Sequence, residues 1–170
     1  MVIKMGKYDL AEKDWFEILS GQNQVQQLME MNQKTQHFGL ALTEEEAKLI
    51  VEKKKESLKE QQRVEFGETI LSKLIDTFCD SPYISQRDYA DTLMRLQEIF
   101  YLYKNESLDE LTDDELLEFM KMAFDGKCQG SLEYLEETVL EEFARIIRSG
   151  ERELLYEESY DYAETDFDDE

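Results

Sequence analysis

The sequence has few of the residues that most often carry chemistry. Its 170 residues include two cysteines, one proline, seven glycines and one histidine. Cys79 and Cys128 form no C-x-x-C pair, which excludes a zinc knuckle and a dithiol redox motif. With His37 alone, neither an H-E-x-x-H zinc site nor the paired Glu-x-x-His motifs of di-iron bundles can be built. We therefore expect no cofactor, no metal and no enzyme of a familiar class.

Long apolar runs and glycine-rich motifs are also missing. The first residues contain no apolar stretch of signal-peptide length, and charged residues interrupt every later apolar run before it reaches membrane-spanning length. The glycines form neither a G-x-x-x-x-G-K-[ST] nor a G-x-G-x-x-G arrangement, so the usual phosphate-binding loops are absent. We predict a cytoplasmic protein that does not contact membranes.

Negative charge is the most abundant feature of the chain. It has 41 acidic and 19 basic side chains and a formal net charge of −22. This charge repels nucleic-acid phosphates and anionic lipids, so we expect no direct nucleic-acid binding and favour a basic protein partner. Hydrophobic residues make up 41% of the chain, which is sufficient for one domain with a sizeable core.

Apolar residues recur at three- and four-residue steps from residue 23 onward, which is typical of α-helices. The expected helical segments are 23–36, 43–60, 66–79, 86–105, 112–124 and 131–149. Residues 9–20 form either a short additional helix or an extended arm packed on the others. We predict an all-α protein in which residues 1–150 form a compact bundle of five to six helices, followed by an acidic tail over residues 151–170.

Capping residues support these helix boundaries. Two capping boxes, Thr43 with Glu46 and Thr112 with Glu115, begin helices. Serines and glycines mark further helix starts and stops, namely Ser85, Ser131, Gly39, Gly126 and Gly150.

The segment 43–60 contains a run of lysines at Lys53, Lys54, Lys55 and Lys59. Glutamates fill its first turn, so the lysines complement the helix dipole and are predicted to lie on a solvated face. A basic contact patch is the alternative interpretation.

Five consecutive apolar or aromatic residues, 99–103, point all the way around the helix 86–105. Either this helix is central and enclosed by the others, or Tyr101 or Leu102 faces a protein partner.

The segment 151–170 differs from the rest of the chain. It holds ten acidic residues and one basic residue, with aromatic residues interleaved among them. This composition is typical of flexible interaction tails, and a solubilising tail is the alternative. The partner-binding candidates in the tail are Tyr156, Tyr160, Tyr162 and Phe167.

The loop 125–136 partly matches a calcium-binding EF-hand. Asp125, Gly130 and Glu136 occupy positions 1, 6 and 12 of the 12-residue pattern. Lys127 stands at position 3, where an oxygen ligand is required, and Gln129 at position 5 is neutral. We therefore expect no metal here, although Asp125, Gln129 and Glu136 are the weak candidates. Helix capping by Gly126 and Ser131 with a turn at Gly130 explains the same residues.

Several segments together resemble an uncharacterised bacterial family of unknown function. They are FGLALT (38–43), RVEFG (63–67), FCDSPY (78–83), LQEIFY (96–101) and FDGKCQGSL (124–132). The resemblance covers about residues 23–148 and implies a helical domain of bacterial, cytosolic origin. It implies no activity, cofactor or catalytic residue.

The charge pattern favours a non-enzymatic helical module for protein interaction or regulation, which binds a basic protein through its acidic surface. One alternative is an acidic mimic of nucleic acid that blocks a DNA-binding protein. Another is a protein that binds a divalent metal at the loop 125–136. The sequence does not define the oligomeric state.

Overall fold

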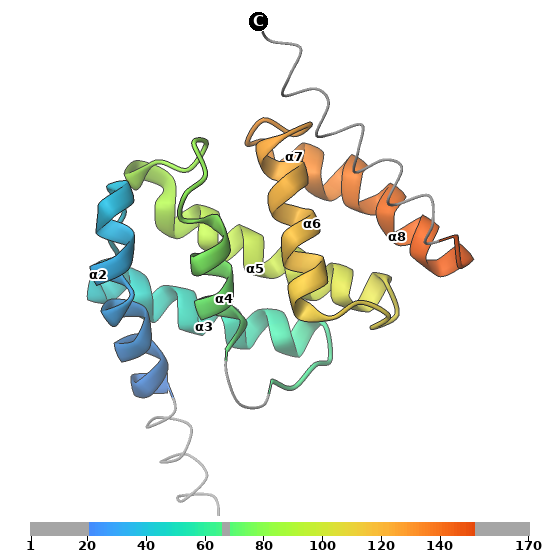
Figure 1. Cartoon of the computed structure of the whole chain (residues 1–170). Coiled ribbons are helices and arrows are strands. Elements are labelled where there is room, and N and C mark those ends of the chain that lie inside the picture. The colour runs from blue at the N-terminus through green and yellow to red at the C-terminus, as the bar shows by residue number, and fades with distance from the viewer. Residues whose placement is uncertain (1–20, 66–68, 152–170) are drawn as a thin grey trace, which may run out of the picture.

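The computed structural model describes residues 21–65 and 69–151, and these residues form helices without any strand (Figure 1). The predicted all-α class is confirmed. The first helix occupies residues 21–30 and continues into α2 (Asn32–Thr35) and a 3₁₀ turn (Gln36–Phe38). The remaining α-helices are α3 (Glu44–Glu60), α4 (Ile70–Phe78), α5 (Tyr89–Glu106), α6 (Asp113–Asp125), α7 (Leu132–Tyr134) and α8 (Leu140–Ser149). The predictions for residues 9–20 and for the tail lie outside the described residues.

Local hydrogen bonds explain where these helices begin and end. In both predicted capping boxes, the threonine side chain accepts from the backbone N–H three residues later, and the glutamate side chain accepts from the threonine N–H. Ser131 caps α7 by accepting from the N–H of Tyr134. Gly39 and Gly150 end their helices with φ of 76° and 80°, a left-handed conformation that favours glycine.

Three local features differ in detail from the predictions. Ser85 makes no side-chain cap, because a 3₁₀ turn (Gln86–Asp88) precedes α5. Helix α6 ends at Asp125 with Gly126 as its C-cap, as predicted, but the φ of Gly126 is −91° and therefore outside the left-handed region. The helix expected over 131–149 is present over 132–149, but its residues Leu135–Val139, between α7 and α8, are π-helical.

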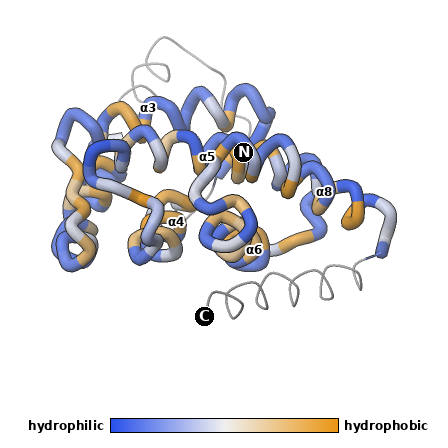
Figure 2. Tube along the Cα trace, turned by 90° about the horizontal axis from the view of Figure 1, so that it is seen from above, coloured by the Kyte–Doolittle hydropathy of each residue, from blue (hydrophilic) through white to orange (hydrophobic). Residues whose placement is uncertain are grey.

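Helix α5 is the centre of the bundle. It packs against α3, α4, α6 and α8, and α4 and α6 lie side by side across it (Figure 1). Figure 2 shows α4 and α6 end-on, with apolar residues concentrated where they meet the other helices, whereas α3 is mostly hydrophilic. This arrangement confirms the interpretation of residues 86–105 as a central, enclosed helix.

Aromatic side chains from distant segments fill the core between these helices. Phe78 of α4 meets Phe124 of α6 edge to face, with ring centroids 5.6 Å apart. Phe119 of α6 stacks on Phe143 of α8, with centroids 3.9 Å apart. Phe100 of α5 is also buried. The core therefore fixes α4, α5 and α6 relative to one another, and these three helices frame the site described next.

Candidate functional site

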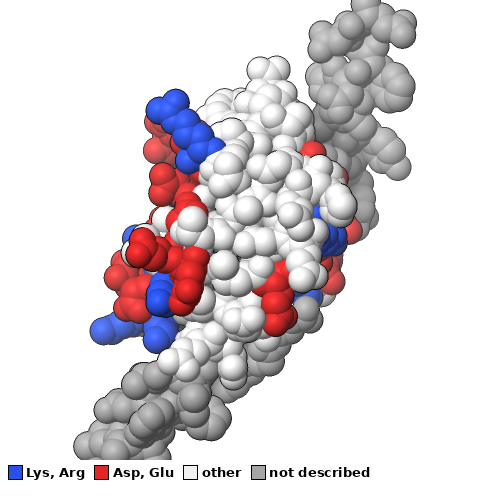
Figure 3. All heavy atoms as spheres, turned by 90° about the vertical axis from the view of Figure 1, so that its left-hand side faces the viewer, with Lys and Arg blue, Asp and Glu red and all other residues white. Residues whose placement is uncertain are grey.

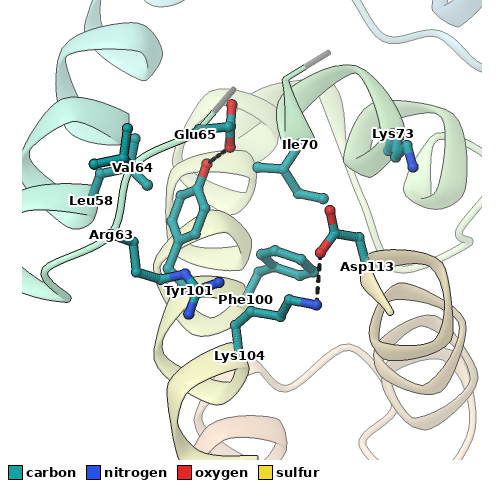
Figure 4. A pocket seen from close by; sticks show the side chains of 10 residues that line it. All are labelled: Leu58, Arg63, Val64, Glu65, Ile70, Lys73, Phe100, Tyr101, Lys104 and Asp113. Atoms are coloured by element: carbon teal, nitrogen blue, oxygen red, sulfur yellow. Dashed lines mark hydrogen bonds and ion pairs between the residues drawn. The ribbon is translucent and has the colours of Figure 1, made fainter. Parts of the chain in front are cut away.

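A buried polar chain connects α3, α5 and the segment after α3. Lys54 is only 4% exposed, although it lies within the predicted solvated lysine run. Its ammonium lies 2.7 Å from the Glu65 carboxylate and donates to the Gln24 side-chain oxygen at 2.8 Å. The Tyr101 hydroxyl donates to the same Glu65 carboxylate (Figure 4). A buried carboxylate requires such partners, so this chain holds residues 61–65 against α5.

The burial of Tyr101 corrects its assignment as a partner-contact residue. Tyr101 is 3% exposed, and both burial and the neighbouring Glu65 carboxylate raise its pKa well above the usual range for tyrosine. Its hydroxyl therefore remains a hydrogen-bond donor. Leu102 is partly buried against the core.

A cavity of about 320 Å³ lies beside this polar chain (Figure 4). Segments distant in sequence form its walls: the end of α3, residues 63–65, the start of α4, the last two turns of α5 and the start of α6. Its apolar lining residues are Leu58, Val64, Ile70 and Phe100. Its polar and charged lining residues are Arg63, Glu65, Lys73, Tyr101, Lys104 and Asp113. Positively and negatively charged side chains thus line the cavity together with a small apolar wall.

The ion pair between Lys104 and Asp113 joins α5 to the start of α6 within this cavity. The Lys104 ammonium lies 2.9 Å from the Asp113 carboxylate and also donates to the Leu111 carbonyl. The Lys104 side chain is 10% exposed, whereas that of Asp113 is 48% exposed. The cation is therefore anchored, and its carboxylate partner faces solvent on one side.

Arg63 is engaged in a separate set of bonds. Its guanidinium donates to both Asp109 oxygens, at 2.7 and 2.9 Å, and to the Asn105 side chain at 2.6 Å. The hydrogen bonds from Arg63 lower the pKa of Asp109. The bidentate geometry fixes the segment after α3 to the turn that follows α5.

The loop 125–136 does not gather the candidate metal ligands. Lys121 ion-pairs with Asp125 at 2.7 Å, and Ser81 donates to the same carboxylate. Arg95 of α5 pairs with Glu136. Over the described parts of the chain, no group of three or more His, Cys, Asp or Glu residues could hold a metal ion. Asp125 and Glu136 thus each pair with a basic side chain, Lys121 within α6 and Arg95 of α5.

Packing explains the glycine at the sixth position of this loop. Gly130 has a φ of 82°, and a Cβ atom there would lie 2.5 Å from the Cβ of Tyr83. Glycine is therefore required by the close approach of Tyr83 and by the left-handed backbone. Gln129 adopts a φ of 47° in the same turn.

Both cysteines are buried free thiols. Burial raises the pKa of Cys128 to about 11 and also raises the pKa of Cys79. The thiol form of each predominates at neutral pH, which does not favour a nucleophilic role.

The outer face of the last helical segment is acidic. Glu133, Glu137 and Glu141 are exposed and follow one another at four-residue steps, and the exposed Tyr134 lies next to them. We call these four residues the outer acidic face. It includes part of the π-helical segment, a type of irregularity often found at functional sites. The tail candidates Tyr156, Tyr160, Tyr162 and Phe167 lie outside the described residues.

Comparison with protein-family models shows which family the chain belongs to. The model of a family of unknown function, DUF6323, matches residues 27–153. The chain belongs to this family. The DUF6323 match runs from within the first helix to just beyond α8, and so it includes the cavity and the outer acidic face. Comparisons with curated proteins and with solved structures found no match.

Membership of DUF6323 confirms the resemblance to a family of unknown function but assigns no role to any residue. Among the described helices, none is long and apolar enough to cross a membrane.

Proposed function

We propose that this DUF6323 domain is a non-enzymatic module that binds a basic protein partner through its outer acidic face. The observation that carries the proposal is the row of exposed carboxylates Glu133, Glu137 and Glu141 beside the exposed ring of Tyr134. Carboxylates increase the rate and specificity of association with a basic surface. An aromatic side chain among them supplies contact area of the kind that dominates binding energy.

Ion pairs elsewhere in the domain support this assignment. Many cations are already matched by carboxylates, as in Arg95 with Glu136 and Arg148 with Glu106. In contrast, Glu133 and Glu137 make no ion pair with a described residue. Their charge is therefore available to an external cation.

The surface over the first helix and α2 carries few charged side chains. Figure 3 shows this side of the molecule, where charged side chains lie along the edges and the middle is largely free of them. Charge is thus distributed unevenly over the domain. A basic partner has a reason to prefer the outer acidic face over this one.

A pair of matched variants tests the proposed function. The full-length wild type, E133Q/E137Q and E45Q/E52Q are used as bait in lysate of the source organism, with cross-linking and mass spectrometry as the readout. Both variants remove two exposed carboxylates, but the second pair lies on α3. We expect one basic protein to be captured by the wild type and by E45Q/E52Q, and lost with E133Q/E137Q. Higher salt should weaken its capture.

Equal capture by both variants, capture independent of salt, or no basic partner for the wild type would contradict the proposal. A truncation after residue 150 then measures whether the tail contributes to the same association.

A further inference from the structure

The cavity between α3, α4, α5 and α6 has the features of a small-molecule site. Its volume of about 320 Å³ lies at the lower end of the range for ligand pockets, roughly 300–1,000 Å³. One part of its wall is apolar, formed by Leu58, Ile70 and Phe100. An adjoining part carries the Lys104–Asp113 ion pair, whose charges face each other beside the ring of Phe100 (Figure 4).

Two other charged groups of the cavity, Glu65 and Arg63, are held more firmly. Glu65 is engaged by the buried Lys54 and by Tyr101, and Arg63 is engaged by both oxygens of Asp109. In the Lys104–Asp113 pair, one member is half exposed. Water can therefore solvate the Asp113 carboxylate when the pair opens, whereas Lys104 needs a new partner. A ligand that supplies a carboxylate to Lys104 can therefore separate Lys104 from Asp113.

We propose that this cavity binds a small zwitterion of the α-amino-acid type with an apolar side chain. The ligand carboxylate binds the Lys104 ammonium, and the ligand ammonium binds the Asp113 carboxylate. Each charge of the opened ion pair then keeps a partner. The apolar side chain contacts Leu58, Ile70 and Phe100.

Charge balance distinguishes this ligand from a simple ion. An anion at Lys104 would leave the Asp113 carboxylate without its cation and next to a like charge. A cation at Asp113 would leave the buried Lys104 ammonium without a carboxylate. A zwitterion avoids both costs, and its zero net charge avoids repulsion by a protein with a net charge of −22.

Calorimetry and thermal unfolding of the full-length protein test the proposal. The probes are L-valine, L-leucine and L-methionine, together with two leucine analogues: 4-methylpentanoate, which lacks the ammonium, and 3-methylbutylamine, which lacks the carboxylate. We expect at least one amino acid to raise the melting temperature in a saturable manner. Both leucine analogues should bind at least tenfold more weakly than leucine. Absence of binding by all three amino acids at millimolar concentration, or equal binding by either analogue, would overturn the proposal.

Two surface variants locate the site. Val64 lines the cavity but is 74% exposed, so V64W should narrow the cavity without disturbing the core. L49W introduces the same side chain at another exposed position, on α3 and outside the cavity lining. We expect V64W to abolish the thermal shift and L49W to retain it. Retention of binding by V64W would place the ligand elsewhere and refute the assignment.

A change in ligand preference tests the role of Asp113 itself. In D113N the ligand ammonium loses its carboxylate partner, so 4-methylpentanoate should bind as well as leucine. An unchanged preference for leucine would contradict the assigned role. The proposal is independent of the outer acidic face, because V64W should leave capture of a basic partner unchanged.

Discussion

Lys54 is buried, although it occurs in a run of lysines that was predicted to be exposed to solvent. The lysines of α3 were expected on one solvated face, and Lys59 in the last turn does lie at the surface. Lys54, however, continues the buried stripe of Ala47, Ile50 and Val51 at a helical step. A lysine within an apolar stripe is therefore a sequence signal that predicts a buried ion pair. The sequence does not reveal that Glu65 is the partner of Lys54, because Glu65 lies in a different segment.

Removal of the Lys54 charge should strongly destabilise the domain. In K54M the side chain keeps its apolar stem, but the Glu65 carboxylate, whose side chain is only 15% exposed, loses its cation. Breaking a buried pair in this way costs about 3 kcal/mol. The matched variant K59M removes an exposed lysine of the same run and should change stability by less than about 0.5 kcal/mol. Urea unfolding followed by circular dichroism measures both, and equal stabilities of the two variants would refute the structural role of Lys54.

At the scale of elements, most helix boundaries were predictable because local interactions determine them. The capping boxes at Thr43 and Thr112 and the stops at Gly39 and Gly150 need only residues within one helical turn. The π-helical segment Leu135–Val139 was missed, since its residues have ordinary helical periodicity. No local signal in those residues distinguishes the two helix types.

The cavity was also beyond sequence analysis, for a related reason. Its walls come from α3, α4, α5 and α6, and only the packing of these helices brings Val64, Lys104 and Asp113 together. The apolar run 99–103 did predict that this turn of α5 is enclosed on every side, and the turn supplies Phe100 and Tyr101 to the cavity. The run itself is compatible with enclosure by other helices and with enclosure by a partner, and only the packing decides between them.

Helix α5 should make the domain sensitive to alkaline pH. Burial raises the pKa of Tyr89 to about 12, and the pKa values of Tyr101 and Tyr103 are also raised. Unfolded tyrosines titrate near pH 10, so above that pH the unfolded state loses protons that the folded state retains. The stabilisation is complete below about pH 10 and is lost as the pH rises toward the folded pKa values.

Each of these tyrosines should lower the free energy of unfolding by about 1.4 kcal/mol per pH unit between roughly pH 10 and 12. Urea unfolding at a series of alkaline pH values measures the total slope. Y89F should reduce this slope by the contribution of one buried tyrosine. Identical slopes for the wild type and Y89F would contradict this account.

The whole molecule combines a compact helical core with a net charge of −22. Its ion pairs connect elements that are distant in sequence, as Lys34 with Asp76 and Arg63 with Asp109 do. Carboxylates outnumber the cations available to pair with them, so the surplus repels itself in the folded state. The same surplus of carboxylates includes the outer acidic face proposed for partner binding. Added salt should therefore raise the stability of the isolated protein and weaken its binding to a basic partner.

Salt should therefore stabilise the isolated protein. Added NaCl screens repulsion among the surplus carboxylates, while the exposed ion pairs that it also screens contribute little. Between low salt and about 0.5 M NaCl at neutral pH, the free energy of unfolding should rise by on the order of 1 kcal/mol. E133Q/E137Q reduces the net charge from −22 to −20 and should show a smaller rise. Urea unfolding at several salt concentrations measures both proteins. A fall in stability with salt would instead mean that attraction within the ion pairs outweighs repulsion among the surplus carboxylates.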